Sequence, residues 1–360
     1  PPPPPLTAPP TTEIYTGDTS SAASDVYKRQ AVRRGSKPVL AGRSTGPIAG
    51  MAKDLELDYR VAQLDDPAAL NAALDGMDLV LHCAGPFSAT SAPMVDACLR
   101  QGVHYLDIPG EISVFLASHA REGEARRRDI VLLPGSGFDV VPTDCLAARL
   151  VQALPAATEL QLAFEAGGGA SPGTARTSVE RLGQGGCVRR DGELRTVPMA
   201  WKTRRIAFAH AERTGVTIPW GDVYTATVST GIPNVEVYLS LPDKTISRLK
   251  MLRRMGPLLR TRALQSFLRG RIERTVSGPS DEVRARTQTQ VWGQVSSPDG
   301  QTVSATMTTP NGYDLTVSAA LGLFEYLRDN DVEGGFYTPS MLAGAGFAES
   351  LPGVSLSIGS

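Results

Sequence analysis

The sequence predicts an α/β fold with a parallel sheet in its first half, followed by an α+β region. Two observations lead to this expectation. From residue 31 to residue 134, short apolar strands alternate with helical segments, which is the pattern of repeated βαβ units. Beyond about residue 155, alternating apolar positions typical of antiparallel strands become more frequent and helices fewer. No internal repeat is visible.

The first region can be read in order from residue 31. Residues 31–35 end a helix, with Gly35 as its C-cap. Strands are expected over residues 37–41, 57–63, 78–83, 103–107 and 130–134. Helices are expected over residues 46–55, 67–74, 88–101 and 111–128. The second of these helices begins with Asp66 as N-cap and Pro67 at its first position.

The second region mixes strands and helices without the βαβ alternation. Strands are expected over residues 158–166, 221–230, 235–241, 282–296 and 302–309, and the last two are joined by a turn at residues 298–300. Helices are expected over residues 173–183, 243–269 and 313–328.

Composition excludes several classes of protein. The 36 Lys and Arg nearly balance the 37 Asp and Glu, which argues against a general nucleic-acid binder. No apolar run reaches the roughly 18 residues of a transmembrane helix. The four cysteines, Cys83, Cys98, Cys145 and Cys187, lack metal-ligand spacing, so no metal site is expected. Unpaired cysteines in a chain without a visible secretory signal favour a cytoplasmic protein.

The start of the chain has a different composition. Seven of the first ten residues are Pro, and small polar residues follow, a mixture that buries too little apolar surface to fold. The run at residues 21–30 resembles adaptor-derived sequence at the ends of translated metagenomic fragments. Residues 1–30 are therefore expected to be a disordered or non-native tail. Ile14 and Tyr15 make a poor central strand on this interpretation.

Two expected turns follow strands at the sheet edge where α/β folds bind ligands. Gly42, Arg43 and Ser44 follow the first strand, and Arg with Ser at this position suits a ribose 2′-phosphate, so NADP is favoured over NAD. The alternative is a solvated surface Arg. Asp65 follows the next strand and could bond adenine, although capping of the following helix is the favoured interpretation for the Asp65–Asp66 pair.

A third turn is rich in small residues. It follows the strand at 78–83 and precedes a helix, so its backbone can approach a ligand and the helix N-terminus favours an anionic group. The alternative is an ordinary βα turn. Its residues, all candidates for cofactor binding, are Cys83, Ala84, Gly85, Pro86 and Phe87.

Five ordered motifs carry a resemblance to a known family. The runs AGRS (41–44), QLDD (63–66), CAGPF (83–87), HYLDIPGE (104–111) and GSGFDVVPTD (135–144) resemble the saccharopine dehydrogenase-like NAD(P)-binding oxidoreductases, which include trans-acting enoyl reductases. The runs SPGTAR (171–176), WGDVY (220–224) and FYTPSMLAGAGF (336–347) are similar to that family as well.

The resemblance implies a domain plan and an activity. It implies a Rossmann-type NAD(P)-binding domain over residues 31–150, an α+β domain for substrate and dimer contacts over 151–309, and a C-terminal helix over 310–353 that returns to the first domain. It also implies hydride transfer between a nicotinamide cofactor and a carbonyl, imine or enoyl substrate, either a small molecule or a thioester-linked group. A homodimer is a further expectation.

One departure from the family pattern bears on cofactor affinity. The phosphate turn should fall near residues 18–24, where the sequence is DTSSAAS and lacks a glycine fingerprint. Asp18 would repel a pyrophosphate. We therefore expect this chain to bind dinucleotide much more weakly than an intact relative.

Three residues are the candidates for proton transfer. Tyr105 and Asp107 end a strand where nicotinamide would lie by analogy, and Asp139 lies in a second strand-to-helix turn. For each Asp, capping or turn bonding is the alternative. His82 and His104 are expected to be packed core histidines.

Rival interpretations remain open at this point. Residues 169–173 match GxSxG, which would make Ser171 a hydrolase nucleophile, although His210 is the sole His after it. A nucleotide or redox sensor without turnover would keep the same fold. Residues 244–274 hold ten Lys and Arg but one acidic residue, so they suit either a solvated amphipathic helix or contact with an acidic carrier or anionic membrane surface.

Overall fold

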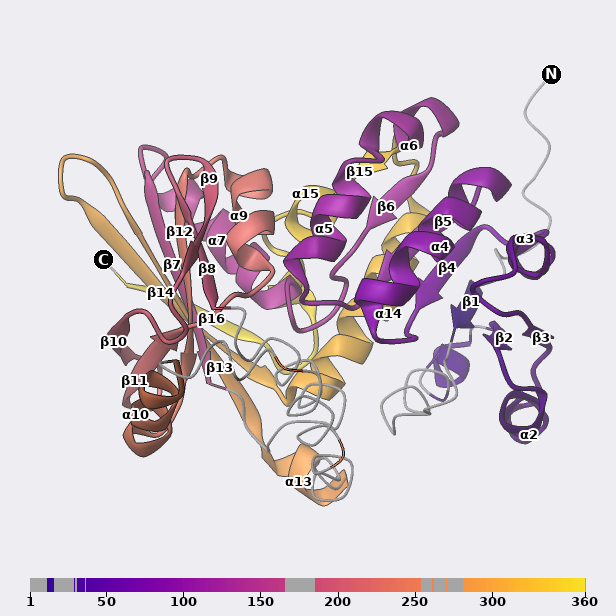
Figure 1. The fold of residues 1–360 in the computed structure, drawn as a ribbon, viewed down its shortest axis with the longest axis horizontal. Helices are drawn as coiled ribbons and strands as arrows, with labels where there is room; N and C mark the ends of the chain where they lie inside the picture. Colours follow the sequence, from indigo (N-terminus) through magenta and orange to yellow (C-terminus); the bar gives the residue numbers. More distant parts are fainter. Residues whose placement is uncertain are drawn as a thin grey trace. The chain divides into compact units, whose positions relative to one another are not determined.

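The computed structural model describes residues 12–15, 29, 31–35, 37–165, 185–253, 261, 270 and 281–359. The chain divides into two compact units (Figure 1). Unit 1 comprises Pro1–Ile108, Ala117–Pro134 and Ala320–Tyr337, and unit 2 comprises Pro109–Leu116, Gly135–Ala319 and Thr338–Ser360. The GxSxG run with Ser171, the expected phosphate turn, the helix expected over 173–183 and most of the basic stretch lie outside the described residues.

Unit 1 is built on a seven-stranded parallel sheet in the order β15-β6-β5-β4-β1-β2-β3. Its strands are β1 (Thr12–Tyr15), β2 (Val39–Gly42), β3 (Tyr59–Val61), β4 (Leu79–His82), β5 (His104–Asp107), β6 (Val131–Leu133) and β15 (Gly335–Phe336). Its helices are α2 (Thr45–Leu55), α3 (Pro67–Leu74), α4 (Phe87–Gln101) and α6 (Glu122–Arg128), while α5 (Ile112–His119) and α14 (Gly312–Asp329) have residues in both units. The predicted fold class, a Rossmann-type parallel sheet with an α+β region, is confirmed.

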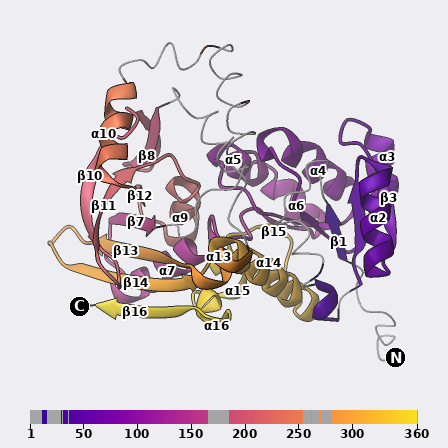
Figure 2. The ribbon, with the colours of Figure 1, turned by 90° about the horizontal axis from the view of Figure 1, so that it is seen from below.

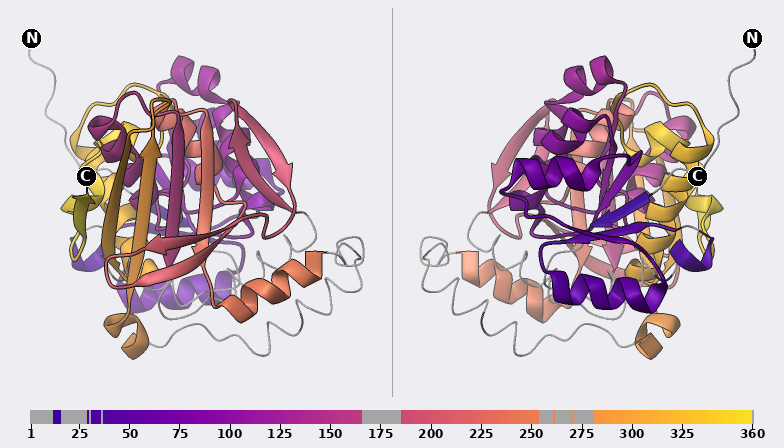
Figure 3. Two further views of the ribbon diagram at one scale, coloured as in Figure 1. Left: turned by 90° about the vertical axis from the view of Figure 1, so that its left-hand side faces the viewer. Right: turned by 90° about the vertical axis from the view of Figure 1, so that its right-hand side faces the viewer.

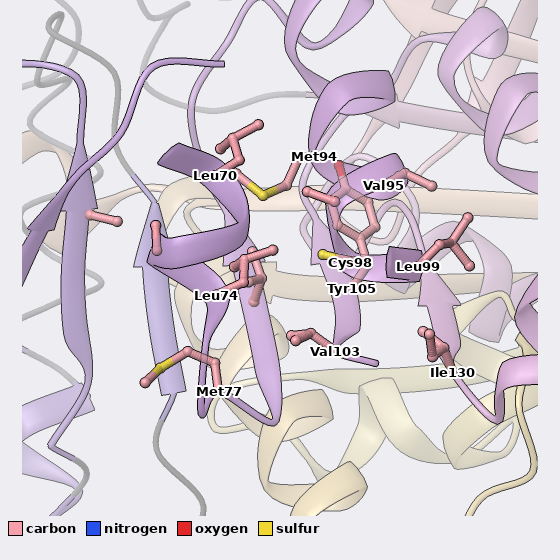
Figure 4. Packing of buried hydrophobic residues seen from close by; sticks show 14 of the residues in the cluster. Leu70, Leu74, Met77, Met94, Val95, Cys98, Leu99, Val103, Tyr105 and Ile130 are labelled. Atoms are coloured by element: carbon pink, nitrogen blue, oxygen red, sulfur yellow. The ribbon is translucent and has the colours of Figure 1, made fainter. Parts of the chain in front are cut away.

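Successive residues of the strands point to opposite faces of this sheet. In β2, Leu40 packs against Ile48 and Ala52 of α2, whereas its neighbours Val39 and Ala41 join the core on the other face. That second core contains buried side chains of α3, α4 and α6 (Figure 4). Figure 1 accordingly shows α2 and α3 on opposite sides of β2 and β3, and Figure 2 shows the same elements from below.

The expectation that residues near Ile14 and Tyr15 make a poor central strand is wrong. The segment Thr12–Tyr15 forms β1, which pairs in parallel with both β2 and β4. All four residues of β2 and all four of β4 are buried. The neighbours therefore supply the apolar surroundings, and hydrogen bonding on both edges places a short segment that has little apolar content of its own.

The helix expected over residues 111–128 is interrupted. It forms α5 and α6, separated by a turn in which the N–H of Arg121 donates to the carbonyl oxygen of Ser118 at 3.0 Å. The other helices and strands expected between residues 37 and 134 are present, with ends shifted by one or a few residues. Asp66 caps α3 as expected, because its Oδ1 accepts from the N–H groups of Ala68 and Ala69, both at 3.0 Å.

Unit 2 contains a nine-stranded mixed sheet (Figure 3, left). Its main path runs β10-β11-β12-β7-β13-β14-β16, and β8 pairs with β12 and β9. The strands are β7 (Glu159–Glu165), β8 (Gly186–Arg190), β9 (Glu193–Val197), β10 (Thr203–Ala207), β11 (Glu212–Thr217), β12 (Asn234–Ser240), β13 (Gln288–Ser296), β14 (Thr302–Pro310) and β16 (Ser355–Gly359). The helices are α7 (Val141–Ala153), α9 (Asp222–Thr230), α10 (Asp243–Leu252), α13 (Asp281–Arg286), α15 (Pro339–Ala343) and α16 (Phe347–Ser350).

Helix α7 packs closely on this sheet at a glycine. A Cβ on Gly293 of β13 would lie 2.7 Å from Leu150 and 3.1 Å from Leu146 of α7. Only glycine lets the two leucines approach the strand this closely.

The strand expected over residues 221–230 is wrong, because this segment forms α9. Its Val and Thr residues imitate a strand, but the buried residues Asp222, Val223, Thr225 and Ala226 recur with the period of a helix. Gly231 ends the helix at φ +75°. Packing on β12 and α7 therefore overrides the local strand propensity.

Among the described residues, no helix combines the length and the apolar character needed to cross a membrane.

Candidate cofactor site

The carboxyl ends of four neighbouring strands lie level in unit 1. Tyr15 of β1 pairs with Ala41 of β2 and with His82 of β4, and His82 pairs with Asp107 of β5. The chain passes from β1 to β2 and β3 on one side and then to β4, β5 and β6 on the other. The sheet therefore has its topological switch point beside β1, where open α/β sheets bind ligands beyond their carboxyl ends.

The residues expected to read the adenosine ribose lie at this edge. Gly42 is the buried last residue of β2, Arg43 is exposed, and Ser44 is the N-cap residue of α2. Asp65 is exposed in the turn between β3 and α3. Since Gly42 pairs with Val61 of β3, the turns after the two strands begin on adjacent strand ends.

The small-residue turn connects β4 to α4. Ala84 is buried at 4% exposure, while Gly85 and Pro86 are exposed and Phe87 is half-buried. Pro86 is the N-cap residue of α4, a 15-residue helix, and gives it no side-chain cap. Because the first N–H groups of a helix have no intrahelical acceptor, this end of α4 suits an anionic group.

Sequence reasoning missed the residue that holds this turn. The hydroxyl of Thr90, in the first turns of α4, donates to the carbonyl oxygen of Ala84 at 2.5 Å and lies 3.2 Å from that of Pro86. Its Oγ1 is also 3.0 Å from Nε2 of His82. Nothing in the sequence distinguishes Thr90 from any other helical Thr, and its role depends on the direction that its side chain takes in the fold.

His82 is a fully buried core histidine, as expected. Its ring meets that of Phe87 edge-on, with 5.7 Å between ring centroids. Burial lowers the pKa of His82 to about 3, so the ring is neutral at physiological pH. The single proton of Thr90 is directed to a carbonyl oxygen, so Nε2 of His82 is the donor in their shared hydrogen bond.

Two of the three catalytic candidates bond to each other. The hydroxyl of Tyr105 donates to Oδ2 of Asp107 at 2.5 Å, and Ser91 of α4 donates to the same oxygen at 3.1 Å. Tyr105 and Asp107 are both fully buried, and Figure 4 shows the Tyr105 ring among the apolar residues of α3 and α4. Burial, with the neighbouring Asp107 carboxyl, raises the pKa of Tyr105, so its phenol stays protonated.

The third catalytic candidate belongs to unit 2. Asp139 is half-buried in the turn before α7, and its carbonyl oxygen accepts from Nε1 of Trp220 at 2.9 Å. Its carboxylate packs against the backbone of Gly110, where a Cβ would lie 2.8 Å from Oδ2. The structure therefore brings Tyr105 and Asp107 together in unit 1 and describes Asp139 in unit 2.

Unit 2 also holds two fully buried carboxyls, Asp144, which follows Asp139 in the same motif, and Asp222, which the sequence did not single out. Asp144 lies in the first turn of α7 and Asp222 in the first turn of α9. Burial raises the pKa of both groups, and the charge of Asp144 adds to the increase for Asp222. A buried carboxyl with a raised pKa holds its proton into the neutral range more readily than an exposed one.

Comparisons with known proteins agree with this geometry. The family model described as saccharopine dehydrogenase NADP binding domain matches residues 16–132. A saccharopine dehydrogenase-like oxidoreductase of Mus musculus is 32% identical over 90 residues, which are 25% of this chain and 21% of that protein. A trans-acting enoyl reductase of Mycobacterium leprae is 34% identical over 115 residues, which are 29% of this chain and 27% of that protein. The chain thus spans about a quarter of the length of these relatives.

Two solved structures share the fold over most of the chain. Saccharopine dehydrogenase (L-Glu forming) of Saccharomyces cerevisiae has a TM-score of 0.67 at 13% identity, covering 97% of this chain and 100% of that one. The homospermidine synthase of Legionella pneumophila, in complex with NAD, has a TM-score of 0.62 at 10% identity, covering 97% of this chain and 91% of that one. Residues 16–132 match the family model of the saccharopine dehydrogenase NADP binding domain, and the order of strands and the turn after β4 agree with this match.

Proposed function

We propose that the protein is an NADP(H)-dependent oxidoreductase. The observation that carries the proposal is the reversal of strand order at β1, with the turn from Cys83 to Pro86 and the uncapped end of α4 at the same edge of the sheet. The matched domain family is named for NADP binding, which agrees with this edge as the cofactor site.

The residues of unit 1 fit a nicotinamide dinucleotide. Ala84 is small and buried, so the backbone of its turn has no bulky side chain between itself and a ligand. The uncapped N-terminus of α4 favours the negatively charged part of the dinucleotide. At the end of β2, the exposed Arg43 with Ser44 is suited to the 2′-phosphate that distinguishes NADP from NAD. The role of Asp65 is to accept a hydrogen bond from the adenine.

The proposed reaction is hydride transfer to or from a carbonyl, imine or enoyl group. When bound, the nicotinamide supplies or accepts the hydride. The chain's own residues must then orient the substrate and move a proton. Asp139 is half-buried and is the most accessible of the three proton-transfer candidates, whereas Tyr105 and Asp107 are fully buried. In this proposal Tyr105 keeps Asp107 oriented, and Asp139 exchanges the proton.

One observation favours a second candidate function. Because the hydroxyl of Tyr105 is already donated to Asp107 inside the core, unit 1 offers no exposed proton donor among its predicted catalytic residues. A sensor that binds the dinucleotide without turnover needs no such donor. We further propose that the substrate is a small molecule or a thioester-linked group and that the protein forms a homodimer.

Consumption of NADPH separates the two functions. The protein is incubated with NADPH and a panel of carbonyl, imine and enoyl thioester compounds, and absorbance of the reduced nicotinamide is followed. If the protein is an enzyme, we expect it to consume NADPH with at least one compound. The Asp139→Asn variant should then lose turnover but still bind NADPH. Binding of NADPH without turnover on any compound of the panel would favour the sensor.

A further inference from the structure

We infer that Thr90 is a positioning residue for the dinucleotide, acting through the turn between β4 and α4. This inference rests on the proposed function, since it assumes that the turn receives the cofactor. The observation behind the inference does not depend on the family match. The Thr90 hydroxyl lies within hydrogen-bond distance of two carbonyl oxygens of the turn and of the buried His82 in the preceding strand.

The Thr90 hydroxyl contacts the peptide groups of the turn, together with His82, which also bonds to the Ala84 backbone. The Thr90 hydroxyl donates to the carbonyl oxygen of Ala84 at 2.5 Å, so that oxygen points toward α4. In a trans peptide the carbonyl and the following N–H point in opposite directions. The N–H of Gly85 therefore points away from Thr90. Two carbonyl oxygens of the turn thus lie at the Thr90 hydroxyl, and the opposite side of the Ala84–Gly85 peptide presents the N–H of Gly85.

His82 of β4 also bonds to the Thr90 side chain. Its neutral ring, fully buried beneath the turn, donates from Nε2 to Oγ1 of Thr90 and leaves the Thr proton for the carbonyl. The edge-on contact between the rings of His82 and Phe87 fixes the first residue of α4 against the same histidine. A chain of contacts therefore runs from β4 through Thr90 to the turn.

Hydrogen bonds other than those of Thr90 also hold helix α4. The next residue, Ser91, ties α4 to β5 through Oδ2 of Asp107. At the other end of α4, Nε of Arg100 donates to Oδ1 of Asn71 at 3.1 Å. Removing the Thr90 hydroxyl should therefore release the turn while α4 and the sheet stay in place, which separates an effect on binding from an effect on folding.

The test compares four variants by titration with NADPH and NADH and by thermal unfolding. Thr90→Val removes the hydroxyl and keeps the shape, and Thr90→Ala removes it without adding a second methyl group. Thr90→Ser restores the hydroxyl. Arg100→Gln is the matched control, because it removes a hydrogen bond of α4 far from the turn.

Thr90→Val and Thr90→Ala are expected to weaken both dinucleotides about tenfold, with an unchanged ratio of NADPH to NADH affinity. Thr90→Ser and Arg100→Gln are expected to bind like the unmodified protein. Unchanged binding by folded Thr90→Val or Thr90→Ala, or a loss in Arg100→Gln of the same size, would overturn the inference and leave the proposed function standing. Absence of binding by the unmodified protein would overturn both.

Discussion

The backbone N–H of Ser340 donates to Oδ2 of Asp144 at 2.7 Å, although the two residues are 196 positions apart. Asp144 is fully buried on α7, and Ser340 is the second residue of α15, so this bond ties the C-terminal segment to the helix that packs on the sheet of unit 2. A second link joins the same helix to α16, between Arg149 and Glu349 at 2.6 Å, but it is partly exposed.

These two links predict different costs of mutation. Asp144→Ala leaves the N–H of Ser340 without its acceptor in a buried position, so the free energy of unfolding should fall by about 1–3 kcal/mol. Glu349→Ala removes a partly exposed ion pair and should cost about 1 kcal/mol or less. Urea unfolding of both variants measures the difference. An equal cost would contradict a structural role for Asp144.

The raised pKa of Asp222 predicts that the free energy of unfolding falls as pH rises. Its pKa is raised in the folded protein, so above its ordinary value of 3.8 the folded state keeps a proton that the unfolded state has released. Folding then takes up a proton, and the free energy of unfolding decreases with pH by up to about 1.4 kcal/mol per unit. The pKa of Asp144 is raised as well, and the charges of Asp144 and Asp139 both add to the increase in the pKa of Asp222.

Asp222→Asn should therefore flatten this decrease and stabilise the protein at about pH 8. Asp299→Asn is the control, because Asp299 is exposed on a turn and its pKa is lowered by a hydrogen bond from Ser297. A lowered carboxyl pKa affects stability only in the acid range, so this control should keep the slope near neutral pH. Urea unfolding from about pH 5 to 8 measures both, and an unchanged slope in Asp222→Asn would refute the assignment.

The lowered pKa of His82 predicts the opposite dependence in acid, where the free energy of unfolding falls as pH falls. Its pKa falls from 6.5 to about 3 on burial, so between these values the unfolded state binds a proton that the folded state excludes. Stability that is present above pH 6.5 is therefore lost as pH falls toward 3. His82→Gln should reduce this acid sensitivity. Acid unfolding monitored by circular dichroism compares this variant with the unmodified protein.

Local patterns predicted most of the first region correctly. Asp66 with Pro67 fixes the start of α3, β6 is apolar over its whole length and β4 is apolar up to its last residue, so neighbouring residues alone specify these elements. The central strand β1 could not be predicted in this way, because its place depends on pairing with β2 and β4, which lie far away in the sequence. The helix α9 was mistaken for a strand for a related reason: its burial against β12 and α7 decides its structure.

The same division holds for the candidate site. The small residues from Cys83 to Pro86 suggest a close backbone approach from sequence alone, and the structure places them directly after β4, the strand beside the switch point. The hydrogen bonds that join His82, Thr90 and the turn could not be predicted, because they require side chains from β4 and α4 to meet in the fold. Burial of Tyr105 and Asp107 likewise depends on how α4 covers β5.

Arg43 predicts selectivity between the two dinucleotides. Its charge at the end of β2 should contact the 2′-phosphate, so Arg43→Ala is expected to weaken NADPH binding about tenfold and leave NADH binding unchanged. This pattern differs from that of Thr90→Val, which should weaken both cofactors equally. A parallel loss of NADPH and NADH affinity in Arg43→Ala would exclude the assigned contact.

Direct titration of the unmodified protein with NADPH, followed by nicotinamide fluorescence and repeated with NADH, tests the central claim. Saturable binding is predicted, tighter for NADPH than for NADH, with a Kd above the low-micromolar range because the segment at residues 18–24 lacks a glycine fingerprint. Absence of saturable binding of either dinucleotide would contradict the cofactor site. A nanomolar to low-micromolar Kd would contradict the predicted weakness of the phosphate turn.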